Sequence, residues 1–168
     1  MPTQAERRES TRTAIVEAAF SAFVEHGAPD VALEDIARAA GVTKSTIHYH
    51  FHSRAGLLAT VAVRLFQDIE ERAMAGDEVT PQSYVRELLL AQAQPVGRVL
   101  FTLGDELMRL GRLEGVDPFR HLEARLRELG LSGSTAVASG AVLQFGRQLA
   151  FGLAQPHEIP RMLDELAL

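Results

Sequence analysis

The sequence contains no cysteine, which excludes disulfide bonds and thiolate chemistry from this chain. It also has no run that approaches the ~20 consecutive apolar residues needed by a membrane-spanning helix. Its first residues, MPTQAERREST, are polar and charged, whereas a signal peptide has an apolar core. We therefore expect a cytoplasmic protein with no membrane partner.

Recognisable catalytic motifs are absent as well. There is no Gly-rich phosphate-binding loop, no nucleophile-elbow serine and no pair of histidines at the spacing of zinc proteases. Asp105 and Glu106 are adjacent on a predicted helix and therefore face different directions, which favours surface ion pairs over a general acid/base pair. We predict that the chain is not an enzyme and has no catalytic residue, no cofactor and no bound metal.

The charge of the chain is unevenly distributed. With 168 residues, 46% of them hydrophobic, the chain is large enough to bury a core, and its formal net charge is −5. From Ile36 to Gln67, however, there is no Asp or Glu, while this window holds three histidines, three arginines and Lys44, the only lysine of the chain. A local basic window of this kind indicates a surface that faces phosphate.

Two short helices separated by a glycine are predicted at the start of this window. Apolar residues at helical spacing indicate the first helix, and they are Leu33, Ile36, Ala37 and Ala40. Gly41 ends that helix, and the hydroxyl of Thr43 can cap the next one. The exposed first turn of the second helix is where a recognition helix meets base edges, and it carries Lys44, Ser45 and Thr46.

The same residues also allow a different interpretation. In a β-strand, His48, His50 and His52 would project from one face and form a row of metal ligands. In a helix the three side chains splay apart, and only His48 and His52 share a face. The helical signals on both sides favour the helix, and a metal-dependent hydrolase built on these histidines is the alternative enzyme hypothesis.

The run GVTKSTIHYHF from Gly41 to Phe51, followed by Ser53, Arg54 and Leu57, resembles the TetR family of bacterial transcriptional regulators. The resemblance covers roughly residues 10 to 60, and the rest of the chain shares only the length and helical character of that family. Two positions depart from the family pattern. His48 stands where the family usually has a phosphate-touching tyrosine, with Tyr49 next to it, and Ala32 stands where a capping Thr or Ser is usual.

This resemblance implies an all-α fold with a three-helix DNA-binding domain in residues 1–52. Its first helix is indicated by small and apolar residues from Ile15 to Phe23 and ends at Gly27. We expect residues 1–9 to be mobile, as a basic arm or as a solvated tail. The predicted DNA-binding residues are Arg12, Thr43, Lys44, Ser45, Thr46, His48, Tyr49, His50 and Arg54.

Residues 53–168 are predicted to form a helical regulatory domain for ligand binding and dimerisation. Its helices are expected at about 53–75, 80–94, 96–110, 118–129, 132–154 and 157–167, and Gly56 should weaken the first turn of the first one. The predicted ligand-binding residues are Phe101, Met108, Phe119, His121, Gln144, Phe145 and Arg147.

The predicted helix 132–154 includes Gly140, Gly146 and Gly152, and a glycine inside a helix costs roughly 0.5 to 1 kcal/mol relative to alanine. Close packing is a compensating reason, either against a second subunit or within the monomer. The face in question carries Ala136, Gly140, Gln144, Arg147 and Phe151, with Gly146 and Gly152 elsewhere on the helix.

By this resemblance we expect a homodimeric repressor that binds a palindromic operator in double-stranded DNA and is released by a small-molecule effector. The resemblance does not identify that effector. A regulator without a ligand, controlled by its abundance or by a protein partner, is the alternative within the same class.

Overall fold

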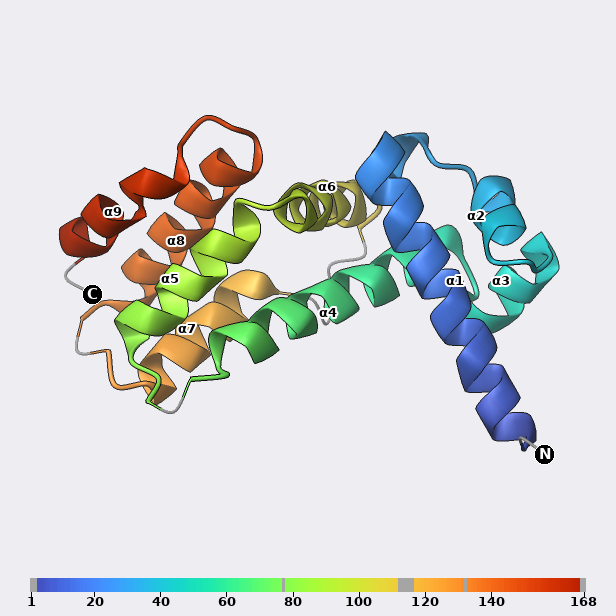
Figure 1. Ribbon diagram of the computed structural model, residues 1–168, viewed down its shortest axis with the longest axis horizontal. Helices are drawn as coiled ribbons and strands as arrows, with labels where there is room; N and C mark the ends of the chain where they lie inside the picture. The colour runs from blue at the N-terminus through green and yellow to red at the C-terminus, as the bar shows by residue number, and fades with distance from the viewer. Residues whose placement is uncertain (1–2, 77, 112–116, 132, 167–168) are drawn as a thin grey trace. The chain divides into compact units, whose positions relative to one another are not determined.

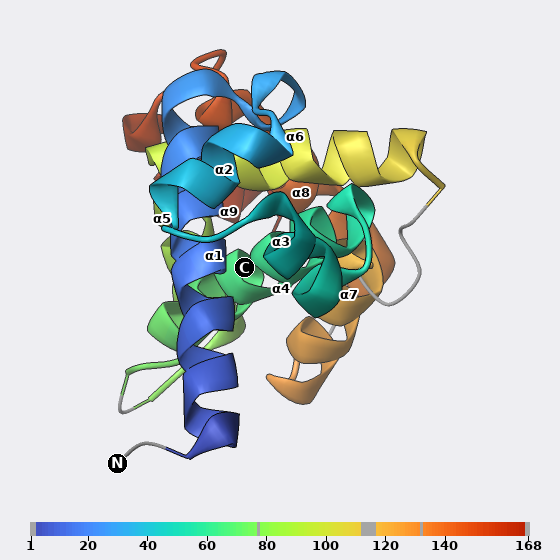
Figure 2. The same ribbon diagram turned by 90° about the vertical axis from the view of Figure 1, so that its right-hand side faces the viewer.

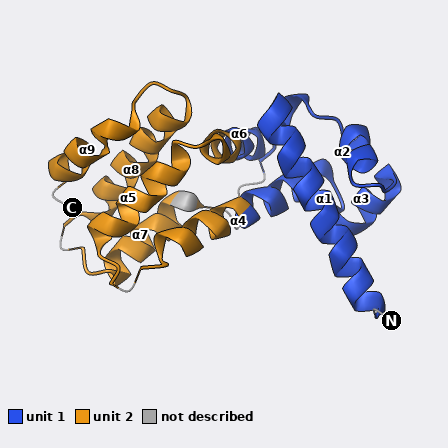
Figure 3. Ribbon diagram, viewed as in Figure 1, with its two compact units in different colours: residues 1–64, 102–113 blue, residues 65–101, 114–168 orange. Residues whose placement is uncertain are grey.

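The computed structural model describes residues 3–76, 78–111, 117–131 and 133–166 (Figure 1). Within these ranges the secondary structure is helical without any strand, which confirms the all-α prediction. The chain divides into two compact units (Figure 3). Unit 1 is Met1–Arg64 with Thr102–Leu113, and unit 2 is Leu65–Phe101 with Glu114–Leu168. Two helices, α4 (Arg54–Ala73) and α6 (Pro95–Arg109), contribute residues to both units.

Unit 1 begins with a long helix, α1 (Gln4–His26), which ends at Gly27, as predicted. The expectation of a mobile segment over residues 1–9 is wrong for residues 4–9, which form the first turns of α1; Met1 and Pro2 lie outside the described residues. A reciprocal cap explains the early start. The Thr3 hydroxyl accepts from the Glu6 backbone N–H at 3.2 Å, and the Glu6 carboxylate accepts from the Thr3 N–H at 2.6 Å.

A short 3-10 turn, η1 (Ala28–Asp30), leads into the two predicted short helices, α2 (Leu33–Ala39) and α3 (Lys44–Phe51). Helix α1 packs on α2, and α2 packs on α3 (Figure 2). Gly41 supplies the positive φ, +67°, that the sharp turn between α2 and α3 requires. Each helix of unit 1 buries one apolar stripe in a shared core, which includes Ile15, Ala19, Phe23, Ile36, Ile47 and Phe51.

Helix α4 begins as predicted, because the Ser53 hydroxyl accepts from the Gly56 N–H at 3.0 Å. The structure shows a packing role for Gly56 in addition to its expected weakening of this turn. A Cβ added there would lie 2.1 Å from the Phe51 carbonyl oxygen. The end of α3 and the start of α4 therefore approach too closely for any side chain at this position.

Unit 2 is built from α5 (Pro81–Gln92), α7 (Pro118–Glu128), α8 (Thr135–Ala150) and α9 (Ile159–Glu165), with the adjoining parts of α4 and α6. Thr80 and Asp117 cap α5 and α7 as predicted. Helix α8 packs on both α5 and α7, and α9 packs on α5. The core of unit 2 includes Ile69, Tyr84, Leu89, Leu126 and Val142.

Two predicted helices of unit 2 are longer than the observed ones. Helix α8 ends at Ala150, and Gly152 follows it with a φ of +72°, so the placement of Gly152 inside the helix is wrong. Helix α9 is preceded by a 3-10 turn, η2 (Pro156–Glu158). Ser132 and Ala167, where two helices were expected to start and end, lie outside the described residues. No helix in the described ranges combines the length and the apolar character that crossing a membrane demands.

Candidate nucleic-acid interface

The outward face of α3 is fixed by what its inward face buries. Ile47 and Phe51 are 1% and 4% exposed, so the helix cannot rotate without opening the core. Its start is capped as predicted, because the Thr46 N–H donates to the Thr43 hydroxyl at 3.2 Å. The Thr43 and Thr46 hydroxyls also lie 2.9 Å apart. This leaves four exposed side chains on α3 that need no rearrangement of the core to meet DNA: Lys44, Ser45, His48 and Tyr49.

The alternative hypothesis of a β-strand that aligns three histidines as metal ligands is wrong, because residues 44–51 form a helix. His50 is half-buried, whereas His48 and His52 are exposed. The His48 Nδ1 atom lies 3.5 Å from the His52 carbonyl oxygen. Across the described residues, no three His, Asp or Glu side chains are grouped so as to hold a metal ion.

His50 lies in an aromatic and cationic environment. Its ring contacts the rings of Tyr49 and Phe51, with centroids 5.2 and 6.2 Å away. Burial lowers the pKa of His50, and the positive charges of Arg8 and Arg12 lower it further against the opposing effect of Glu9. His50 is therefore favoured in its neutral form, in which it cannot act as a cation toward phosphate.

Arg12 bridges α1 to both α3 and α4. Its guanidinium lies 4.8 Å from the Phe51 ring centroid, in cation–π contact. Nη1 donates to the His50 carbonyl oxygen at 3.2 Å, and Nη2 donates to the Thr60 hydroxyl at 3.5 Å. The structure thus gives Arg12 a role in holding unit 1 together, in addition to its predicted role as a DNA contact.

Arg8 is a further residue of this surface that was predicted only as part of an arm. Its guanidinium lies 5.3 Å from the ring centroid of Tyr49, which is 62% exposed. Because α1 starts at Gln4, Arg8 and Arg12 are one helical turn apart on the same face. The Thr3–Glu6 capping pair was the signal in the sequence that could have placed them there.

Arg54 is directed toward the connection between α1 and α2. Nη1 donates to the Val31 carbonyl oxygen at 2.5 Å, and Nη2 donates to the carbonyl oxygens of Ala28 and Pro29 at 2.6 and 3.5 Å. The guanidinium N–H groups that donate these hydrogen bonds are the same groups that would bind a phosphate. We interpret Arg54 as a residue that positions α2, with any DNA contact secondary.

Arg54→Ala should therefore lower stability. Hydrogen bonds to charged groups contribute about 1.5–3 kcal/mol, and since three carbonyls lose a shared donor we expect a loss of about 2–3 kcal/mol in the free energy of unfolding. Arg38→Ala is the matched control, because the Arg38 side chain is 78% exposed and pairs only at the surface with Asp35. Urea unfolding of both variants measures the difference. If the two variants are equally stable, Arg54 does not position α2, and its predicted role as a DNA contact stands alone.

Lys44 already has a partner within the protein. Its Nζ donates to Glu34 Oε1 at 2.5 Å, across the turn from α3 to α2. Both side chains are about half exposed, at 50% and 55%. The hydrogen bond from Lys44 is the main cause of a lowered pKa for Glu34, which keeps this carboxylate ionised.

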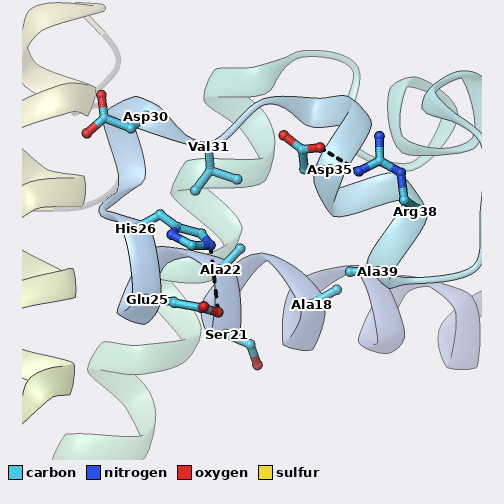
Figure 4. Close-up of a pocket in the computed structure, with 10 residues that line it drawn as sticks. All are labelled: Ala18, Ser21, Ala22, Glu25, His26, Asp30, Val31, Asp35, Arg38 and Ala39. Atoms are coloured by element: carbon cyan, nitrogen blue, oxygen red, sulfur yellow. Dashed lines mark hydrogen bonds and ion pairs between the residues drawn. The ribbon is translucent and has the colours of Figure 1, made fainter.

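A hollow of about 520 Å³ lies elsewhere on unit 1, lined by residues of α1, η1 and α2 (Figure 4). Four of its lining side chains form two pairs, Arg38 with Asp35 at 2.8 Å and His26 with Glu25 at 3.7 Å. None of the predicted DNA-binding residues lines it.

The predicted ligand-binding residues are spread over both units. Met108 belongs to unit 1 and is 63% exposed, while the others belong to unit 2. Arg147 lies over the rings of Phe101 and Phe151, 5.8 and 5.4 Å from their centroids. Phe145 packs against the core, and Gln144 is exposed. Their part in ligand binding stays a prediction.

His121 and Phe119, the two predicted ligand residues on α7, have separate surroundings. The His121 Nε2 atom lies 2.8 Å from the Glu70 carboxylate, which also accepts from Arg125 Nε at 2.9 Å. Burial alone would raise the pKa of Glu70, but the hydrogen bonds from His121 and Arg125 bring it below its usual value. Phe119 lies beside Gly140, since a Cβ added to that glycine would be 3.7 Å from its ring. Glu70 and Arg125 were not predicted from the sequence.

Comparison with known proteins matches part of this chain to a known family. The model of the family described as bacterial regulatory proteins, tetR family, matches residues 15–61. The regulator TtgR of Pseudomonas putida is 39% identical over 88 residues, which cover 51% of this chain and 42% of TtgR. The repressor LfrR of Mycolicibacterium smegmatis is 43% identical over 67 residues, which cover 40% of this chain and 34% of LfrR. These matches span less than half of each relative's length.

Solved structures extend the likeness of the fold to almost the whole chain. A transcriptional regulator from Rhodococcus sp. RHA1 has a TM-score of 0.70 at 22% identity and covers 94% of this chain and 95% of its own. NalD, the secondary repressor of the MexAB-OprM multidrug efflux pump in Pseudomonas aeruginosa, has a TM-score of 0.55 at 24% identity, with 95% of both chains covered.

Proposed function

We propose that this chain, whose residues 15–61 match the model of the tetR family of bacterial regulatory proteins, is a DNA-binding transcriptional repressor of that family rather than an enzyme. It binds a palindromic operator in double-stranded DNA as a homodimer and is released by a small-molecule effector. A protein that acts on the bacterial chromosome works in the cytoplasm.

One observation carries this proposal. The first turn of α3 presents Lys44 and Ser45 to solvent, while Ile47 and Phe51 of the same helix are locked in the core. A recognition helix needs this combination, because base edges are read by exposed side chains whose positions are fixed by a rigid support. The window from Ile36 to Gln67, which contains no acidic residue, supplies the charge balance that phosphate requires.

The proposed contacts divide into two groups. Lys44 and Ser45, at the start of α3, read base edges, and His48, Tyr49 and Thr43 contact the DNA backbone. A second group supports the interface from within the protein and consists of Arg12, Thr46, His50 and Arg54. Their hydrogen bonds and ring contacts to unit 1 support this division.

Selection from a pool of random DNA duplexes tests the function. We expect the protein to enrich a sequence with two inverted half-sites about 34 Å apart, or a multiple of it, since a two-fold dimer presents two α3 helices. Footprinting on the enriched duplex then shows protection of both half-sites. Failure to enrich any duplex would contradict the proposal.

A face of α8 supports the proposed homodimer. Val137 on α8 is 68% exposed, and Phe151, which directly follows the helix, is 37% exposed. Gly140, Ala141, Gln144 and Gln148 lie between these two positions on the same side of α8 as Val137. Apolar side chains exposed together in this way are typical of a surface covered by another molecule. Gly140 is less suited to testing this face, because a larger residue there would press on Phe119 within the monomer.

Val137→Glu should therefore yield monomers in sedimentation, since it would place a charge in the dimer interface. Affinity for the enriched duplex should fall with dimerisation, while helical content is retained. Val24→Glu, at a valine that is 44% exposed on α1, is the matched control and should stay dimeric. If the Val137→Glu protein remains dimeric, the dimer interface lies elsewhere on the molecule and not on this face of α8.

The effector is proposed to bind unit 2 and to act through α4, which contributes residues to both units. A ligand can release the operator only if it binds the released state better than the DNA-bound state, so DNA must weaken ligand binding by the same factor. A ligand found by thermal shift whose affinity is unchanged by saturating operator would favour the regulator without a ligand.

A further inference from the structure

The only lysine of the chain is held by a carboxylate before any DNA arrives. Lys44 Nζ donates to Glu34 Oε1, ten positions earlier in the sequence and on the neighbouring helix. His48, the next basic group along the same side of α3, also lowers the pKa of Glu34, more weakly than Lys44 does. The proposed interface therefore contains a negative charge that is absent from the Ile36–Gln67 window.

The position of this charge matters because of how a helix-turn-helix meets DNA. The second helix enters the major groove, while the first helix crosses the phosphate backbone. Glu34 lies on the first helix, α2, and half of its side chain is exposed. A carboxylate there repels nearby phosphates unless a cation stays between them.

We propose that Glu34 determines specificity by holding Lys44 toward base edges and by penalising DNA that offers Lys44 only phosphate. This inference rests on the proposed function. An ammonium group has three donors, so Lys44 can keep one on Glu34 and direct the others to acceptors such as the O6 and N7 atoms of guanine. On the correct base pair the ion pair stays intact. On other sequences Lys44 turns to a phosphate, and Glu34 is left beside the DNA without its cation.

The chain provides a matched control for this role. Asp35 is the next residue on α2, and its side chain is 56% exposed, against 55% for Glu34. Asp35 pairs with Arg38 on its own helix at 2.8 Å, and among the described residues it forms no hydrogen bond or ion pair with α3. Glu34→Gln and Asp35→Asn thus remove the same charge from adjacent exposed positions, and only the first releases Lys44.

Fluorescence anisotropy with two duplexes tests the proposal in the full-length protein. One duplex is the sequence enriched by the wild type from the random pool, and the other is a scrambled duplex of equal composition. Glu34→Gln should tighten binding to the scrambled duplex about fivefold for each subunit of the dimer, as expected for removing a repulsion between unit charges in water, and leave the enriched duplex within about twofold. Asp35→Asn should leave the ratio of the two affinities unchanged.

The outcomes separate the inference from the proposed function. If the wild type enriches no duplex from the random pool, the proposed function fails and the role of Glu34 fails with it. If the wild type discriminates between the duplexes and Glu34→Gln keeps the same ratio, only the role of Glu34 is overturned. If Glu34→Gln binds both duplexes more tightly by the same factor, the role of Glu34 is also overturned, because an equal increase in affinity indicates a general charge effect.

A second measurement needs no DNA. Protein labelled with carbon-13 in lysine has one lysine side chain, so its Cε resonance reports on Lys44 alone. We expect Glu34→Gln to shift this resonance and Asp35→Asn to leave it in place. An unchanged resonance in Glu34→Gln would show that the ion pair does not persist in solution and would overturn the proposal.

Discussion

Lys44→Ala should weaken binding to the operator by about 2–6 kcal/mol, because a lost base contact costs about 1–3 kcal/mol and a dimer loses two. The free energy of unfolding should change by less than about 0.5 kcal/mol, as is usual for an exposed surface position. Lys44 has one described partner, and exposed ion pairs contribute little to stability. Anisotropy with the enriched duplex and urea unfolding measure the two quantities.

Arg120→Ala is the control for the change in net charge. Its side chain is 86% exposed on α7 of unit 2, where it pairs with Asp117 at 3.3 Å. It should leave operator affinity unchanged within the error of the measurement. Parallel losses of stability and affinity in Lys44→Ala would indicate that this residue supports the fold and would remove it from the base-reading group.

Gly97→Ala should destabilise unit 2 by about 3 kcal/mol or more, at or beyond the upper end of the usual cost of overpacking. A Cβ at this position would lie 2.0 Å from the Gln92 carbonyl oxygen and 2.5 and 2.6 Å from two further backbone atoms of Gln92. Backbone at the end of α5 cannot move aside as a flexible side chain can. The whole turn between α5 and α6 would have to open.

Gly104→Ala in the same helix provides the comparison. No heavy atom lies within 4 Å of a Cβ added there, so alanine should be tolerated and should gain about 0.5–1 kcal/mol from its higher helix propensity. Urea unfolding followed by circular dichroism measures both variants. Similar midpoints for the two proteins would show that the α5–α6 turn adjusts at little cost.

Local signals in the sequence predicted where four of the helices begin. Thr43, Ser53, Thr80 and Asp117 each cap the helix that follows them, as their hydroxyl or carboxylate groups and positions indicated. Gly41, with its positive φ, lies in the turn between α2 and α3. These features depend on residues a few positions apart, so the sequence itself contains the necessary information.

The partners of charged residues were harder to predict. Arg12 and Arg54 lie in or beside a basic segment, which favoured contact with phosphate, yet their observed partners include backbone carbonyls 38 and 23 positions away. Glu34 was outside the window that drew attention to α3, although it contacts Lys44. Such pairings depend on how the helices pack against one another, and the order of charges along the sequence does not specify that packing.

The predicted ligand site illustrates the same limit in unit 2. Phe101, Phe119 and Phe145 were chosen as apolar residues at helical spacing, a pattern shared by core, surface and pocket positions. The structure places Phe145 against the core and leaves Phe119 36% exposed. Distinguishing these environments requires the packing of α7 and α8 on their neighbours, which no local pattern specifies.

Unit 1 is built from two separate stretches of the chain, which limits how it can be joined to other proteins. Unit 1 includes Thr102–Leu113 from the later half of the chain, and Leu103 and Leu107 in that segment are 0% exposed. A gene fusion that joins residues 1–64 to a foreign sensor would omit this segment and leave its apolar counterpart surface uncovered. Residues 1–64 alone are therefore an incomplete unit, and a working chimera must include a second, separate stretch of the parent sequence.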